Sequence, residues 1–422
     1  MSSTPNQTGC TLPPEKVFPI QIGSDLFRLS GASIASDAPS YFSQFFEEQL
    51  AQGNASNIRT LYIDRDPATF HEIARHLQGY HVRPRDGAQF VKLFADAQFY
   101  SLPRLMSQLF ESEIFIQIGE RHFEIPRDIF SSPGDAPNFF TLGFAIFFAS
   151  PSEVFPGLDR KGLLRPPAIV PPSVPNRSAD VFAELLHLLR GYPIHIRNEE
   201  HRAELLRDCR YFHLRGLEQR LIPYQITVNP FTQRSEIAIR LHDVRPSGIH
   251  FSRDSASVPA GSVTYARPFV DEAPADLILE IGDESTVIDR ENMRADFLGL
   301  AKSRIASMLQ VVAKKMDVSD APPSLSENSI QIHWGRETDF TVDGKQDFQP
   351  LGVDFNAGDG SEPPPAKRPR SDGPSGRLTV RTGQWRVRVR PRPTGAFEVI
   401  FVAVKIDAFT SARARNRSRT FL

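Results

Sequence analysis

Cysteine is scarce in this chain, and that scarcity excludes several kinds of protein. Only Cys10 and Cys209 occur among the 422 residues, too few for a disulfide framework or an all-cysteine metal site. Such sparse use is typical of a reducing compartment. Cys209 falls in a helical pattern, where we expect a buried core residue rather than a reactive thiol.

Long apolar runs and processing signals are also missing. The longest apolar run, Leu142 to Ala149, is far shorter than a membrane span. The segment from Met1 to Pro14 lacks the charged-then-apolar layout of a signal peptide. We therefore expect no membrane span and a location in the cytoplasm, with the nucleus as the alternative.

The nucleotide-binding, nucleophile-elbow and zinc-helix motifs of common enzymes do not occur in the sequence. Asp64 and Asp66 look like a pair of catalytic carboxylates. However, Asp66 followed by Pro67 is the pattern of a helix N-cap with proline at the first helical position. We expect a protein without enzymatic activity, cofactor or bound metal.

Charge of both signs is present but unevenly distributed. The formal net charge is −1, yet the segment from Lys367 to Arg419 holds 14 basic and 3 acidic residues. An acidic body with a basic end indicates an anionic partner for that end, or a contact with the protein's own body.

Short patterns recur about 100 residues apart, in the same order along the chain. The recurring pairs are Phe18–Gly23 with Ile114–Gly119, Leu77–Tyr80 with Leu189–Tyr192, and Gln98–Leu102 with Arg210–Leu214. A period of this length indicates two tandem globular domains, the second longer than the first.

Each copy begins with a strand pair around a glycine turn and continues into helices, which predicts a small α+β domain. In the first copy, Phe70, Ile73 and Leu77 follow helical spacing and are expected to be buried. Beyond the copies, the pattern predicts strands at 237–241, 262–265, 277–281 and 329–334, a helix at 292–316, and a closing hairpin of 378–390 with 396–407.

The first copy resembles the BTB/POZ fold of the potassium-channel tetramerisation type, also called T1 or KCTD. The resemblance rests on six short motifs in order: Ile20–Gly23, Phe27, Ile63–Asp66, Phe70, Leu77–Tyr80 and Ala97–Leu102. The second copy keeps the glycine turn, Leu189–Gly191 and Tyr211–Leu214, but has Pro-rich sequence in place of the Ile-Asp-Arg-Asp segment. The tandem arrangement is similar to that of fungal BTB-domain stress-response regulators.

The resemblance and the patterns together define an expected α+β architecture of two tandem BTB/POZ domains and a mixed α+β C-terminal domain with a disordered insert. The expected divisions are a disordered N-terminus at 1–15, BTB/POZ domain 1 at 16–110, a degenerate domain 2 at 113–224 with a Pro-rich insertion at 131–175, a C-terminal domain at 225–350 and 377–410, a disordered basic and Pro-rich insert at 352–376, and a basic tail at 411–422.

The resemblance also implies an interaction surface. Asp64, Arg65 and Asp66 stand where members of the family contact neighbouring subunits. The implied partners are the protein itself, as a homo-oligomer or as two copies paired within one chain, a cullin-3 ubiquitin ligase, or a signalling phosphatase acting in stress response.

Two basic clusters leave alternatives open. Lys367, Arg368 and Arg370 fit the pockets of a nuclear-import receptor, or they are a solvated linker. Arg386, Arg388 and Arg390 alternate along a predicted strand and form either an anion-binding face or an ordinary solvent-facing strand.

The function expected first is therefore a non-enzymatic interaction adaptor. The alternative is a nuclear factor that associates with nucleic acid or chromatin through the basic C-terminal segment. Nucleic acid is the less favoured partner, because the basic residues are confined to the end of the chain and no DNA-reading helix is visible.

Overall fold

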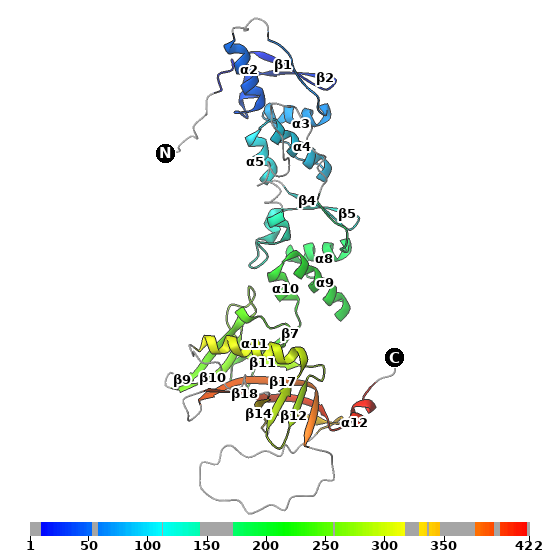
Figure 1. Ribbon diagram of the computed structural model, residues 1–422, viewed down its shortest axis with the longest axis vertical. Helices are drawn as coiled ribbons and strands as arrows, with labels where there is room; N and C mark the ends of the chain where they lie inside the picture. Colours follow the sequence, from blue (N-terminus) through cyan, green and yellow to red (C-terminus); the bar gives the residue numbers. More distant parts are fainter. Residues whose placement is uncertain are drawn as a thin grey trace, which may run out of the picture. The chain divides into compact units, whose positions relative to one another are not determined.

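The computed structural model divides into two units, Met1–Glu218 and Gln219–Leu422, and each is described by itself (Figure 1). The residues described are 10–52, 58–111, 113–143, 172–255, 258–316, 329–335, 337–346, 376–391 and 397–419.

The first half of the first unit is a small sheet followed by helices. Strand β1 pairs antiparallel with β2 and parallel with β3. Gly23 makes the turn between β1 and β2 at φ +51°, where a Cβ would lie 3.0 Å from the Arg65 carbonyl oxygen. The elements are β1 (Val17–Ile22), β2 (Asp25–Ser30), α1 (Gly31–Ala35), α2 (Tyr41–Ala51), β3 (Leu61–Ile63), α3 (Pro67–Leu77), α4 (Gly87–Phe99) and α5 (Pro103–Glu111).

Local sequence signals explain where these helices begin. Ser40 forms a capping box at the start of α2, and Asp66 caps α3 with Pro67 at its first position. Phe70, Ile73 and Leu77 lie on the buried face of α3, which confirms the helical spacing read from the sequence. The mixture of helices and strands in this half is confirmed as well.

The second half of the first unit repeats this order of elements. Strand β4 pairs antiparallel with β5 and parallel with β6, and Gly119 turns the chain at φ +57°. Helices follow the sheet, as in the first half. The elements are β4 (Ile114–Ile118), β5 (Arg121–Ile125), a 3₁₀ turn η1 (Arg127–Phe130), β6 (Ser173–Val174), α8 (Ala179–Leu189), α9 (Glu199–Phe212) and α10 (Arg215–Leu221).

The insertion predicted at 131–175 includes residues at each end that have counterparts in the first half. The Asp135 carboxylate accepts a hydrogen bond of 2.7 Å from the Leu217 backbone N–H, as Asp37 accepts one of 2.9 Å from Leu105 in the first half. At the other end, β6 belongs to the sheet. Residues 131–143 and 172–175 thus have counterparts in the first half, and residues 144–171 lie outside the described part of the chain.

The second unit is built on a 12-stranded sheet in the part of the chain that the structure describes. Its order is β16-β15-β18-β14-β13-β12-β17-β10-β11-β8-β7, with β9 paired to β10. The strands are β7 (Tyr224–Val228), β8 (Ser235–Arg240), β9 (Ile249–Ser255), β10 (Val258–Tyr265), β11 (Ala275–Ile281), β12 (Thr286–Asp289), β13 (Arg294–Phe297), β14 (Ser329–His333), β15 (Asp339–Val342), β16 (Lys345–Gln346), β17 (Arg377–Pro391) and β18 (Phe397–Phe409).

Strand β17 joins most of this sheet together. It pairs antiparallel with β18 along its length and also with β10, β11 and β12. The closing hairpin predicted at 378–390 and 396–407 is confirmed as β17 and β18. The predicted insert at 352–376 lies outside the described residues, apart from Gly376.

The helix predicted at 292–316 is wrong in its first third. Residues Arg294–Phe297 form β13, in which Ala295 and Phe297 point to one buried face, and helix α11 covers only Gly299–Lys315. Gly299, the first residue of α11, adopts φ +54° at the turn from β13 into the helix. Leu300, in the first turn of α11, is 78% exposed, so it does not continue the buried face of β13.

Two short elements complete the unit, the 3₁₀ turn η2 (Pro246–Gly248) and helix α12 (Ala412–Arg417). Part of the basic tail predicted at 411–422 is therefore helical. Ser411 caps α12, and Arg415 donates a 2.7 Å hydrogen bond to Glu284. The segment 1–9 of the predicted N-terminal tail lies outside the described residues.

Candidate functional site

The three residues of the predicted interaction surface, Asp64, Arg65 and Asp66, have different roles in the structure. Asp64 is exposed. The Asp66 carboxylate accepts hydrogen bonds from the Ala68 backbone N–H at 3.1 Å and from the Thr69 hydroxyl at 2.8 Å. The hydrogen bond from Thr69 lowers the pKa of Asp66. Asp66 therefore caps α3, and both Asp64 and Asp66 remain exposed.

Arg65 turns into the domain. Its guanidinium forms an ion pair with the buried Asp96 on α4 and lies 4.0 Å from the centroid of the Phe99 ring. Burial raises the pKa of Asp96 to about 6, against the opposing effect of the Arg65 charge. This arrangement ties the segment after β3 to helix α4.

The same constellation recurs in the second half of the unit. Arg177 follows β6 and donates a 3.1 Å hydrogen bond to the buried Asp208 on α9, and its guanidinium lies 4.1 Å from the centroid of the Tyr211 ring. Burial also raises the pKa of Asp208. The second copy therefore keeps the arginine of the Ile-Asp-Arg-Asp segment, which corrects the expectation that Pro-rich sequence replaces the segment entirely.

The sequence contains a signal for this pair besides the short motifs. Arg65 and Arg177, and likewise Asp96 and Asp208, are separated by the same number of residues as the Leu77–Tyr80 pattern and its repeat. The Asp-Ala-Pro run at Asp37 likewise returns at Asp135. The repeat spacing thus relates the two arginines and the two buried aspartates, while the Asp-Ala-Pro run returns at a shorter spacing.

The predicted arginine trio lies on β17, where Arg386 and Arg388 each contact a carboxylate. Arg386 donates a 2.7 Å hydrogen bond to Glu236, and Arg388 donates one of 2.9 Å to Asp254. Arg390 is exposed. These partners offset the positive charge of Arg386 and Arg388, an arrangement that favours a solvent-facing strand over an anion-binding face.

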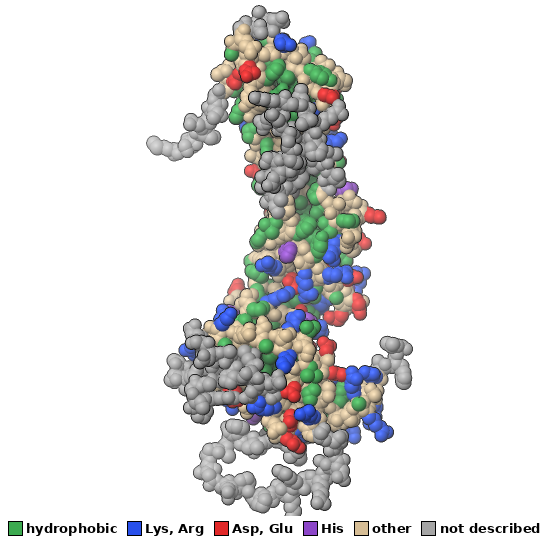
Figure 2. Space-filling view, in the orientation of Figure 1, with side chains coloured by type: hydrophobic (Ala, Val, Ile, Leu, Met, Phe, Trp, Pro, Cys, Tyr) green, Lys and Arg blue, Asp and Glu red, His purple; other side chains and the backbone are tan. Residues whose placement is uncertain are grey.

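The other basic residues fall into two groups. Lys367, Arg368 and Arg370 lie outside the described residues. Figure 2 shows Lys and Arg side chains gathered around α12, where Arg413 and Arg417 are exposed. The hydrogen bond from Arg415 lowers the pKa of Glu284.

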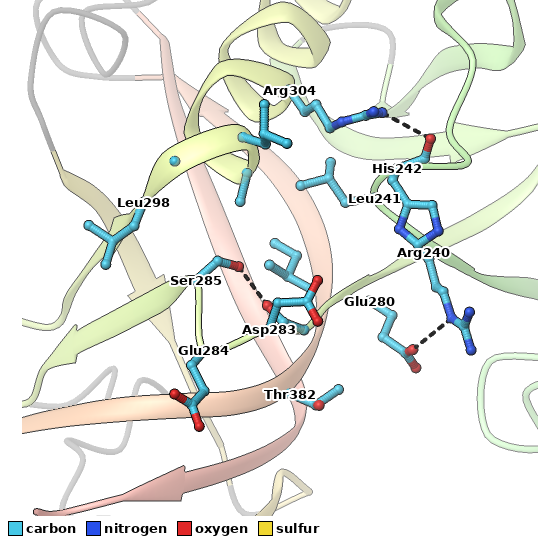
Figure 3. A pocket seen from close by; sticks show the side chains of 15 residues that line it. Arg240, Leu241, His242, Glu280, Asp283, Glu284, Ser285, Leu298, Arg304 and Thr382 are labelled. Atoms are coloured by element: carbon cyan, nitrogen blue, oxygen red, sulfur yellow. Dashed lines mark hydrogen bonds and ion pairs between the residues drawn. The ribbon is translucent and has the colours of Figure 1, made fainter. Parts of the chain in front are cut away.

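A pocket of about 850 Å³ opens in the second unit, between the end of β8, the β11–β12 connection and the start of α11 (Figure 3). Arg304 donates a 2.9 Å hydrogen bond to the His242 carbonyl oxygen, and the Arg240 guanidinium lies 3.7 Å from Glu280. The lining thus combines charges of both signs, with Leu298 exposed at the rim. We interpret it as an open groove rather than a catalytic pocket.

Two further properties concern metals and membranes. Within the described residues, no group of three His, Cys, Asp or Glu side chains is placed to hold a metal ion. Nor does any helix in that part of the chain have the length and apolar character needed to cross a membrane.

Comparison with known sequences identifies the first half of the first unit. Residues 19–110 match the sequence model of the BTB/POZ domain. This segment, with its three-stranded sheet, its helices and its Arg65–Asp96 pair, is a BTB/POZ domain of the tetramerisation (T1) type. Domains of this family generally act as interaction modules rather than as enzymes.

The chain is similar to two proteins of Saccharomyces cerevisiae. One is the uncharacterized protein YDR132C, 34% identical over 334 residues, which are 67% of this chain and 66% of the relative. The other is the BTB/POZ domain-containing protein YLR108C, 36% identical over 244 residues, which are 57% of this chain and 48% of the relative. The chain thus spans just under two thirds of the first relative and about half of the second.

Proposed function

We propose that this chain is a non-enzymatic adaptor that oligomerises and binds partner proteins through two tandem BTB units. The observation that carries the proposal is the duplicated ion pair, Arg65–Asp96 and Arg177–Asp208. The two pairs lie in successive halves of the first unit, and the first half is a BTB/POZ domain. A fold by itself does not define a function, so the proposal depends on surfaces that experiments can alter.

The segment 113–224 is, in this proposal, a degenerate second BTB domain. Its support is the repeated order of strands and helices, the glycine turn at Gly119 and the retained arginine–aspartate pair. Two such domains in one chain are held at high effective concentration, so they can pair with each other as well as with a second chain.

The exposed surface beside β3 is the part of the first domain that we assign to contacts between subunits. Tyr62 is exposed on β3, and Asp64 follows it on the same side of the extended segment. Both residues lie outside the buried Arg65–Asp96 pair, so changing them leaves that pair intact.

A double variant, Tyr62→Lys with Asp64→Lys, tests this assignment in the full chain. We expect its mass by multi-angle light scattering to fall relative to wild type if copies associate through this surface. Tyr80→Lys is the matched control, because Tyr80 is an equally exposed tyrosine of the same domain. A wild-type chain that is monomeric, or a double variant with the mass of wild type, contradicts the proposed surface.

The proposed partners are a signalling phosphatase in a stress response or a cullin-3 ubiquitin ligase, as the family resemblance suggests. Affinity purification of the tagged full chain with quantitative mass spectrometry distinguishes them. Enrichment of one partner class with wild type and the Tyr80 control, and its loss with the double variant, supports that class. If neither partner class is enriched over an untagged control, both proposed partners are contradicted.

We place the protein in the cytoplasm, with nuclear import through Lys367, Arg368 and Arg370 as the open alternative. A nucleic-acid-binding function is less favoured, because Arg386 and Arg388 already contact Glu236 and Asp254.

A further inference from the structure

Strand β7 is the terminal strand of the sheet in the second unit. All five of its residues are exposed. Tyr224, Ile226 and Val228 share one face and are 43%, 48% and 61% exposed. Opposite them on β8, Ile239 and Ile237 are buried, so the apolar face of the sheet continues onto a strand whose side chains remain exposed.

The residues with exposed apolar side chains, Tyr224, Ile226 and Val228, also direct their backbone hydrogen-bonding groups away from β8. The Asn229 N–H donates to the Arg234 carbonyl oxygen at 2.9 Å, which identifies a hydrogen-bonded pair with the hairpin partner. Bonded pairs alternate along an antiparallel ladder, so Thr227 and Gln225 also bond towards β8. The N–H and C=O groups of Tyr224, Ile226 and Val228 therefore point outward.

This edge carries none of the features that usually prevent strand addition. Edge strands are commonly protected by charged residues, by proline or by being very short. The segment Tyr224–Val228 contains neither charge nor proline, whereas the strand at the opposite end of the sheet, β16, is only Lys345–Gln346. The charge of Arg267 beside the apolar row is already compensated, because this side chain, stacked 3.5 Å from the Tyr224 ring centroid, pairs with Asp271 at 2.7 Å.

We propose that β7 pairs antiparallel with β7 of a second copy of this chain, about a two-fold axis at Ile226. In this register Ile226 faces Ile226 of the second copy, and Tyr224 faces Val228. Each outward N–H then meets an outward C=O, because the same three residues present these groups on both strands. Two-fold pairing also keeps both apolar rows on one face of the joined sheet.

The sequence of β7 favours β7 of a second chain as its partner over an unrelated strand. Its pattern of apolar and polar residues reads the same in both directions about Ile226, with Gln225 facing Thr227. Since it has no charge, self-pairing brings no like charges together. The proposal concerns the second unit alone and does not require the BTB surface to be correctly assigned.

Cysteine cross-linking in the full chain tests the register. We expect Ile226→Cys, in a Cys10→Ser background, to form a disulfide-linked dimer of twice the 47.3 kDa chain mass under mild oxidation. Directly opposed residues have Cα atoms about 5.5 Å apart, which is within disulfide range. Cys209 is buried and serves as an unchanged background thiol.

Thr227→Cys in the same background is the matched control. In the proposed register Thr227 faces Gln225, so the two substituted positions in the Thr227→Cys dimer are separated by roughly 8 Å and cannot be bridged without backbone movement. A disulfide-linked dimer of the Ile226→Cys variant but not of the Thr227→Cys variant supports the proposal. No dimer of either variant, or equal dimers of both, overturns it.

A second measurement does not depend on cross-linking. Ile226→Lys should lower the mass of the oligomer in solution about twofold, while Thr227→Lys, on the opposite face, should leave it within error of wild type. Circular dichroism verifies that both variants fold. If Ile226→Lys keeps the wild-type mass, the proposal fails; if it instead loses a co-purified protein, the edge belongs to that protein's strand.

Discussion

Arg65 and Arg177 direct their charge inward, each against a carboxylate that the fold buries. Asp96 is 5% exposed and Asp208 is 1% exposed. Removing two opposite charges from water costs about as much as their attraction returns, so such a pair is weak evidence of added stability. The pair acts on geometry instead. Each arginine follows the parallel strand of its sheet, and the ion pair connects it to the second helix after that strand.

The raised pKa of Asp96 predicts how stability responds to pH. The folded state holds this proton more tightly than the unfolded chain, whose aspartate has an ordinary pKa near 3.8. The contribution of Asp96 to the free energy of unfolding is therefore fully present below that value and is lost as the pH rises through about 6.

Urea unfolding of wild type and Asp96→Asn between about pH 4 and pH 8 measures this effect. We expect wild type to lose stability relative to Asp96→Asn across that interval. Leu26→Ala, at an exposed site without a titratable group, serves as the control and should run parallel to wild type. Parallel curves for wild type and Asp96→Asn would show that Asp96 does not titrate as stated.

Phe70 gives a second prediction at this scale. Its ring is fully buried on α3, 5.7 Å from the Phe42 ring and 5.6 Å from the Tyr100 ring. Phe70→Ala should lower the free energy of unfolding by about 3–5 kcal/mol, because it leaves a cavity. Tyr80→Ala, at an exposed site, should change it by no more than about 0.5 kcal/mol. Equal effects of the two substitutions would refute the core position of Phe70.

At the scale of elements, the arginines of β17 differ in whether their carboxylate partners are buried or exposed. Arg386 reaches Glu236, a buried carboxylate on β8, whereas Arg388 reaches Asp254 at a contact where both side chains remain well exposed. The alternation of Arg and Val indicated a strand correctly. It could not indicate which arginine had a buried partner, because Glu236 and Asp254 lie far away in sequence.

This difference predicts unequal effects of neutralisation. In Arg386→Ala, the Glu236 carboxylate keeps the hydrogen bond from Asn229 but loses its charged partner. The substitution should lower the free energy of unfolding by roughly 1–3 kcal/mol. Arg388→Ala removes an exposed pair and should cost about 0.5 kcal/mol or less. Guanidinium unfolding of both variants measures the difference, and equal losses would argue against the buried contact.

Elements with strong local signals were predictable from the sequence, and non-local ones were not. The periodicity of α3 and the glycine turn at Gly23 were sufficient because both depend on neighbouring residues. The boundary between β13 and α11 was missed because Phe297 and Leu300 fit a helical spacing by chance. The sheet order was beyond prediction, since β17 pairs with strands from which it is widely separated in sequence.

For the whole molecule, the basic segment outside the described residues predicts a change in location without a change in stability. If the segment acts as an import signal, a fluorescent fusion of the variant Lys367→Ala, Arg368→Ala, Arg370→Ala will be less nuclear than the wild-type fusion. Its unfolding curve should match wild type, because the sequence predicts a disordered insert here, and charges in such a segment contribute little to folding. Wild-type and variant fusions that are equally cytoplasmic would leave the segment as a solvated linker.

The position of β17 near the end of the sequence has a consequence for how the protein is made. Strands β10, β11 and β12 leave the ribosome before their shared partner, and at about 5–20 residues per second the delay is on the order of ten seconds. The first unit, whose strand pairings all fall within its own residues, can fold during that interval. The second unit must wait with unpaired edges until β17 and β18 emerge, so it is the part of the nascent chain most exposed to chaperones and to misassembly.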